Sequence, residues 1–231
     1  LPISATGTAG GHNSGDLTPA ERRPALIEAA LPHIAFDGWT TTSLYQGARD
    51  MGLDPALVDL AFPGGIWDAI DFYLDDANRV MTEELVARDV DQMKIRDKIT
   101  NAVLIRIDLA DRHPEAVRRL LGLLLQPQNS GRMTRYLWQA ADAMWRAAGD
   151  TSTDYNWYTK RAILSAVYSS TLLVWMADET PDRSETKAYL NRRIENVMQF
   201  EKTKAKVLKA GENRPSLTRF LGRLRYPRAQ T

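Results

Sequence analysis

The residues of this chain that could most readily hold a metal ion or transfer a proton are its three histidines, His12, His33 and His113. Imidazole changes charge near neutral pH and is a common metal ligand. Two ligands on one helix reach the same metal when they lie three or four residues apart, yet no such histidine pair and no Glu-x-x-His sequence occurs. The chain has no cysteine, which excludes thiolate metal sites, cysteine nucleophiles and disulfides within it. The sequence therefore predicts no metal site.

Nucleophilic and phosphate chemistry have no signature either. No Gly-x-Ser-x-Gly sequence occurs, and the glycines of Ala9–Gly11 precede no predicted strand, as a phosphate-binding loop would require. The carboxylate pairs Asp75–Asp76 and Glu83–Glu84 lie on a predicted charged helix face, where solvation accounts for them. With no catalytic constellation, we expect a non-enzymatic protein without a cofactor.

The elements that would have to position a site are all helical. Apolar residues recur at three- and four-residue steps along most of the 231 residues, and no alternating strand pattern appears. No apolar run approaches the roughly 18 to 20 residues that span a bilayer. We predict an all-α fold with a disordered lead at 1–16, a helix-turn-helix-like subdomain at 17–87, a helical domain at 88–210, and a linker with a terminal helix at 211–231.

The amino-terminal helices follow a helix-turn-helix pattern. Thr18–Glu21 is a capping box, short helices are predicted at 42–51 and 56–62, and a long helix runs from Ile66 to Ala87. The pattern over Leu26–Tyr73 resembles the amino-terminal part of the TetR repressor family. That resemblance implies a TetR-like helical bundle and leaves a ligand-responsive transcription regulator as the alternative function.

The charge of this region argues against DNA binding. From Asp50 to Asn78 the chain has no lysine or arginine and seven aspartates. A duplex carries about one negative charge per 1.7 Å and is bound by cations. We therefore expect the helix-turn-helix to be degenerate, retained as scaffold, with no DNA binding.

A second feature is the run Leu120–Leu125, which is apolar almost all round. Such a helix is buried on several sides, either as plain core or as one wall of a ligand cavity. Both alternatives need the same side chains, so the sequence leaves them open.

The carboxy-terminal helix predicted at 216–226 is amphipathic and basic. Four apolar side chains fall within about a 100° arc, arginines lie opposite or beside it, and nine basic residues face one acid from Lys202 to Arg228. This favours reversible attachment to anionic membrane lipids over docking onto the protein's own body or a dimer mate. The predicted membrane-binding residues are Leu217, Arg219, Phe220, Leu221, Arg223, Leu224 and Arg225.

Four of the six tryptophans lie between Trp138 and Trp175. After a Gly-Asp-Thr-Ser break, the side chains that can share one helix face are Asp154, Trp157, Tyr158, Arg161, Ser165 and Tyr168. Aromatic and arginine side chains arranged in this way either fill a core or form a contact hot spot. We assign Trp138, Trp145 and Trp175 to the core.

One motif in this stretch identifies a family. The run Ala148-Gly149-Asp150-x-Ser152-x-Asp154-x-Asn156-Trp157-Tyr158-Thr159-Lys160-Arg161 is followed by Tyr168, Thr171 and Trp175-x-x-Asp178. It closely resembles the accessory lipid-binding proteins of ubiquinone biosynthesis, the ninth in the Coq series. The match extends across Ile99–Val197, and a motif of this length is specific.

The resemblance implies a TetR-like, often dimeric protein that has lost DNA binding. It further implies an apolar pocket for lipid, including isoprenoid quinone precursors, and a terminal helix that touches membrane lipids. The partner would be a quinone hydroxylase of the pathway, of the di-iron type, although other quinone hydroxylases exist. We expect a peripheral membrane location, at the cytoplasmic face of a bacterial inner membrane or on the mitochondrial matrix side for a processed eukaryotic protein.

Two sets of site residues follow. The family's partner-binding surface maps here to Asp154, Trp157, Tyr158 and Arg161. For the lipid pocket no motif fixes the residues, and Leu121, Leu124 and Leu125 are predicted from their apolar setting.

Overall fold

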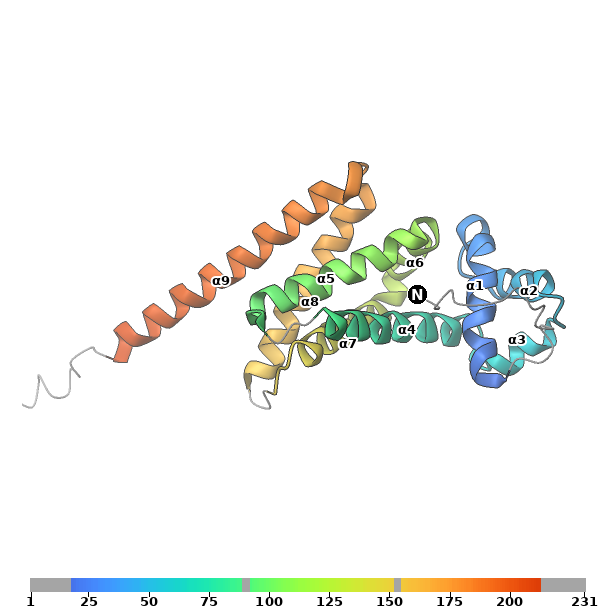
Figure 1. Cartoon of the computed structure of the whole chain (residues 1–231), viewed down its shortest axis with the longest axis horizontal. Helices are drawn as coiled ribbons and strands as arrows, with labels where there is room; N and C mark the ends of the chain where they lie inside the picture. The colour runs from blue at the N-terminus through green and yellow to red at the C-terminus, as the bar shows by residue number, and fades with distance from the viewer. Residues whose placement is uncertain (1–17, 89–91, 152–154, 213–231) are drawn as a thin grey trace, which may run out of the picture. The chain divides into compact units, whose positions relative to one another are not determined.

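The computed structural model describes residues 18–88, 92–151 and 155–212 (Figure 1). The chain divides into two compact units, Leu1–Leu190 and Asn191–Thr231. The described residues are helical and contain no strand, so the all-α prediction is confirmed. The elements are α1 (Pro19–Asp37), α2 (Thr41–Asp50), α3 (Ala56–Ala61), α4 (Ile66–Ala87), α5 (Ile95–Arg112), α6 (Pro114–Leu124), the 3-10 turn η3 (Pro127–Asn129), α7 (Ser130–Ala147), α8 (Tyr155–Ala177), the 3-10 turn η4 (Pro181–Arg183) and α9 (Ser184–Glu212).

Local chemistry explains the first helix. The Thr18 hydroxyl accepts a hydrogen bond from the Glu21 amide, and the Glu21 carboxylate accepts one from the Thr18 amide at 3.0 Å. Both groups satisfy backbone donors that a helix start leaves unpaired. The predicted capping box is confirmed.

The structure adds detail to the predicted organisation. Residues 127–129 after α6 form the 3-10 turn η3, and the Asn129 side-chain amide donates to the Leu123 carbonyl at 2.8 Å. In the predicted 88–210 domain, α5 begins at Ile95. The backbone of α9 is helical as far as Glu212, two residues into the segment predicted as a linker. The membrane-binding residues predicted between Leu217 and Arg225 lie outside the described residues.

The sequence suggested that the acidic run of the helix-turn-helix lacks positive partners. The structure shows that two of its aspartates form ion pairs. Asp68 pairs with Arg23 of α1 at 2.9 Å, and Asp71 pairs with Arg135 of α7 at 2.6 Å. Both arginines come from outside the run and reach it through tertiary packing. These ion pairs fix α4 against α1 and α7, which is a scaffold role.

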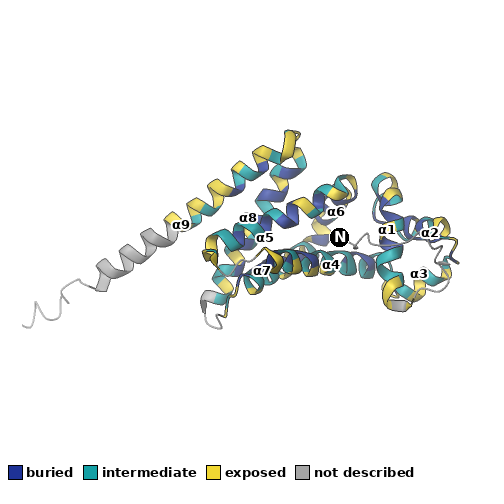
Figure 2. Cartoon of the chain, viewed as in Figure 1, coloured by how far each residue is buried: buried dark blue, intermediate teal, exposed yellow. Residues whose placement is uncertain are grey.

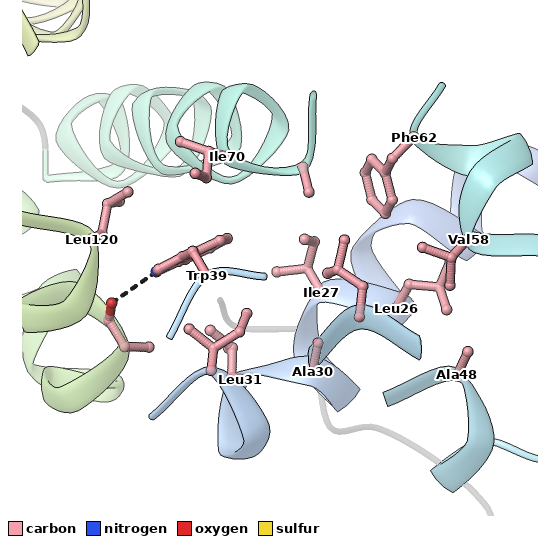
Figure 3. Packing of buried hydrophobic residues seen from close by; sticks show 14 of the residues in the cluster. Leu26, Ile27, Ala30, Leu31, Trp39, Ala48, Val58, Phe62, Ile70 and Leu120 are labelled. Carbon is pink, nitrogen blue, oxygen red and sulfur yellow. Dashed lines mark hydrogen bonds between the residues drawn. The ribbon is translucent and has the colours of Figure 1, made fainter. Parts of the chain in front are cut away.

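Buried residues occur on every helix of the first unit (Figure 2). The helix-turn-helix is not separate from the rest, because its core continues into α6. Figure 3 shows Trp39 beside Leu120, with its indole Nε1 donating to the Ala116 carbonyl at 2.9 Å. Leu120 belongs to the same apolar cluster as Leu26, Phe62 and Ile70.

At Gly47 the backbones of α1 and α2 pack closely together. A Cβ at this position would lie 2.6 Å from the Ala30 nitrogen and 2.8 Å from its Cα, both backbone atoms that cannot turn away. Gly122 on α6 is the opposite case, since a Cβ there meets nothing within 4 Å.

We therefore expect Gly47→Ala to lower the free energy of unfolding by about 1 to 3 kcal/mol through overpacking. Gly122→Ala, the same substitution at a helical glycine in open space, is expected to raise it by roughly 0.5 to 1 kcal/mol. Urea denaturation of both variants measures the difference. Equal effects at the two glycines would contradict the close packing of α1 on α2.

Candidate ligand cavity and aromatic surface

Two of the three predicted pocket leucines lie at an apolar cavity. Leu121 and Leu124 are buried on α6 and line a cavity of about 70 Å³ among α4 to α8. Leu125 is not part of it, and its prediction is corrected, because α6 ends at Leu124 and the Leu125 side chain is 51% exposed. The lining residues that the next arguments use are Tyr73, Asn78, Arg106, Leu109, Tyr168 and Leu172.

The cavity is small for a lipid. An engineered cavity of about 150 Å³ is known to hold a single benzene ring. A second, larger cavity of about 250 Å³ adjoins it among α1, α4 and α5. Tyr73, Ala77 and Leu109 line both cavities and form the wall between them. A ligand with a substituted ring would therefore require this wall or the α6 leucines to move.

The apolar cavity carries polar groups that the sequence analysis missed. Arg106 is only 7% exposed, and its Nε donates to the Tyr168 hydroxyl at 3.2 Å. Burial raises the pKa of the Tyr73 phenol to about 12, although the Arg106 charge opposes this, so Tyr73 is neutral at physiological pH. One signal could have revealed Arg106, because it lies three residues after Val103 on the apolar face of α5.

The predicted partner-binding surface is partly an exposed aromatic cluster. Tyr158 is 61% exposed, Trp157 is half-buried, and their ring centroids are 4.7 Å apart. Trp138 of α7 completes the cluster at 5.6 Å from Trp157, so its assignment to the core is wrong. Trp145 is also half-buried, whereas Trp175 is fully buried as predicted. Asp154 lies outside the described residues.

Arg161 is not a surface residue, which corrects its prediction as a contact. It is 1% exposed and lies between two carboxylates, with Nε 2.6 Å from Asp142 and Nη1 3.1 Å from Asp150. Nη1 also donates to the Trp157 carbonyl at 3.2 Å, and the guanidinium lies 4.2 Å from the Trp157 ring centroid. Two negative partners compensate the buried charge. Arg161 therefore positions the aromatic cluster and cannot itself touch a partner.

In the part of the chain that the structure describes, no cluster of three or more histidine, aspartate or glutamate residues could hold a metal ion. The same residues include no helix long and apolar enough to cross a membrane.

The arrangement of helices defines the class of protein first. The chain is similar to the crystal structure of a TetR transcriptional regulator from Nitrosomonas europaea, with a TM-score of 0.62 and 18% identity, covering 75% of this chain and 95% of that one. At this identity the similarity concerns the fold alone, and the TetR-like fold is confirmed.

The sequence comparisons are more specific. Residues 131–201 match the COQ9 family model. The chain is 33% identical to the mitochondrial ubiquinone biosynthesis protein COQ9 of Rattus norvegicus over 81% of this chain and 62% of that protein. For the human protein of the same name, identity is 32% over 88% of this chain and 66% of that protein. The chain is thus related to COQ9 proteins over most of its length, as the sequence motif indicated, and spans just under two thirds of these two relatives.

We expect Arg161→Met to lower the free energy of unfolding by about 3 kcal/mol, because it removes the buried cation that bridges Asp142 and Asp150 and leaves these carboxylates with the more exposed Arg146 and Lys160. Arg146→Ala is the matched control. Arg146 pairs with the same Asp142 at 2.8 Å, but its side chain is 71% exposed, and its loss should cost less than about 1 kcal/mol. Chemical denaturation measures both, and losses of equal size would contradict a positioning role for Arg161.

Proposed function

We propose that this protein acts in ubiquinone biosynthesis as a non-enzymatic accessory protein that binds an isoprenoid quinone precursor. Its similarity to proteins named for ubiquinone biosynthesis supports the pathway. The observation that carries lipid binding is the apolar cavity walled by Leu121 and Leu124. No cofactor is required, because the bound lipid is cargo.

Hydrophobic transfer sets the energetics of this function. Moving an isoprenoid chain out of the bilayer exposes apolar groups worth about 0.8 kcal/mol per CH₂, so the protein must cover them. The cavity of about 70 Å³ covers only a small part of such a chain. We infer that ligand entry widens the cavity by separating α6 from its neighbours or by joining the adjoining cavity through Tyr73 and Leu109.

The test of this function is lipid mass spectrometry of the full chain purified from cells that make ubiquinone. We expect an isoprenoid quinone or precursor at a substantial fraction of one lipid per chain. A pair of tryptophan substitutions in the cavity wall, Leu121→Trp with Leu124→Trp, should lower that fraction several-fold by filling the space. Consistent recovery of the unaltered protein without lipid would sink the proposal.

A separate experiment tests the rival function of a ligand-responsive regulator. The structural neighbour is a TetR transcriptional regulator, but in this chain α3 and its flanks carry Asp54 and Asp59 and no cation. A salt-sensitive mobility shift of duplex DNA at moderate salt would favour the regulator.

We also propose that the exposed part of the aromatic cluster is where a membrane-associated quinone hydroxylase docks, of the di-iron type by family resemblance. Tyrosine and tryptophan dominate interface hot spots when they are partly exposed. Tyr158 is the best candidate for direct contact, because it is more exposed than Trp157 and takes no part in the Arg161 ion pairs.

We expect Tyr158→Ala to weaken binding of the purified hydroxylase by roughly 10-fold or more, a typical hot-spot loss, with little change in stability. Phe36→Ala removes an aromatic side chain at the end of α1 that is even more exposed (82%, against 61% for Tyr158) and should leave binding unchanged. Surface plasmon resonance compares the two, and equal losses or no loss at Tyr158 would argue against this docking surface.

Three further features remain predictions from the sequence. They are attachment to membrane lipids through residues 216–226, a peripheral membrane location and a homodimer. The exposed side of α8 favours a second copy, since residues 162–177 carry no charge and Leu173 is 53% exposed. Sedimentation velocity measures dimerisation, and vesicle flotation measures membrane binding. A protein that sediments as a monomer and does not bind anionic vesicles would refute both predictions.

A further inference from the structure

Arg106 is a buried cation in an apolar setting. It lies on α5 among the buried side chains of Val103, Ile105 and Ile107, is 7% exposed, and lines the cavity that Leu121 helps to form. Burying a guanidinium costs several kcal/mol unless charge partners or hydrogen bonds compensate it.

The compensation is incomplete. Arg161, the other buried arginine of the described residues, lies between two aspartates. Among the described residues, Arg106 forms a single side-chain hydrogen bond, from Nε to the Tyr168 hydroxyl, and its Nη1 is buried without a partner. Since buried polar atoms are normally hydrogen-bonded, an unpaired arginine nitrogen at a cavity wall indicates a ligand position.

A second unpaired group lines the same cavity. The Asn78 side-chain oxygen on α4 is buried and accepts no hydrogen bond from any residue that the structure describes. The cavity thus presents a charged donor from α5 and an acceptor from α4, together with the phenols of Tyr73 and Tyr168. The remaining wall is mainly apolar, as an amphipathic ligand requires.

We propose that Arg106 and Asn78 anchor the head group of the bound lipid. Arg106 donates to an acceptor oxygen of that head group, preferably a carboxylate or an ionised phenol, and Asn78 accepts from a hydroxyl. The ligand class is therefore an acidic or hydroxylated head group on an apolar chain, such as a prenylated hydroxybenzoate or a fatty acid. The inference rests on the proposed lipid-binding function and specifies which end of the ligand lies deepest.

The preference for an anion follows from the surrounding charges. Tyr73 stays neutral because burial raises its pKa to about 12. Glu28 and Asp76 line the adjoining larger cavity rather than this one. An anionic oxygen at Nη1 would give Arg106 the negative partner that Arg161 already has.

The experiment compares probes with matched chains, dodecanoate and dodecanol, by calorimetry on the full chain. A hydrogen bond to a charged group is worth roughly 1.5 to 3 kcal/mol, which corresponds to a 10- to 100-fold preference. We expect the unaltered protein to prefer dodecanoate by at least about 10-fold. Arg106→Met should abolish that preference and change dodecanol binding little. A second pair of probes, geranyl-4-hydroxybenzoate and geranylphenol, repeats the comparison on an aromatic head group. The affinities of the two acids, compared with each other, distinguish an aromatic head group from a fatty acid.

Controls separate a specific effect from misfolding. Arg112→Met makes the same change on the same helix at a residue that lines only the larger cavity, and it should keep the preference. Arg106→Lys, which retains the charge, should restore part of it, and circular dichroism checks helicity. Should Arg106→Met unfold the chain, Asn78→Ala takes its place, with a loss of affinity for geranyl-4-hydroxybenzoate but not for dodecanoate.

The outcomes discriminate between this inference and the proposed function. Equal binding of dodecanoate and dodecanol, or a preference that survives Arg106→Met, overturns the head-group site while leaving lipid binding intact. Failure of every probe to bind the unaltered protein overturns lipid binding itself.

Discussion

The aromatic surface depends on one buried charge, the Arg161 guanidinium between Asp142 and Asp150. These three groups join α8 to α7 and to the turn after α7, with nitrogen–oxygen distances of 2.6 and 3.1 Å. The same guanidinium binds the Trp157 carbonyl and lies over its ring. Breaking a buried pair leaves an uncompensated charge, so this contact tolerates little change. It ties α8 to α7 beside Trp157, next to the exposed Tyr158.

At the cavity, in contrast, the buried arginine is incompletely paired. Arg106 is buried as deeply as many core residues, but within the described part of the chain its side-chain partner is a phenol, that of Tyr168. The Arg161 cluster is closed and satisfied, whereas the cavity beside Arg106 keeps unpaired polar atoms in an apolar wall. The two arginines therefore differ in how their buried charge is compensated, and the proposed docking surface and ligand site lie beside one each. Under the proposed function, the cavity of about 70 Å³ would have to widen to admit a lipid and could close again on its release.

The sequence predicted the helices well and the site unevenly. Periodicity, the Thr18 capping box and the glycine turns report local chemistry, and most helix boundaries followed from them. Leu121 and Leu124 were correctly predicted to line a cavity, because a helix that is buried on several sides is apolar almost all round. Arg161 and Leu125 were misplaced, because exposure depends on partners far along the chain, such as Asp142, and on where α6 ends. Trp138 was missed for the same reason, since only the packing of α7 against α8 brings it to Trp157.

A crystal structure of the full chain grown with a prenylated hydroxybenzoate tests the central claim most directly. That claim is that the helical unit opens around a ligand whose head group meets Arg106. The account predicts ligand density between α5 and α8, an oxygen within about 3 Å of the Arg106 guanidinium, and displacement of Leu121, Leu124 or Tyr73. Ligand bound only at the outer surface, with the cavity still near 70 Å³, would contradict it.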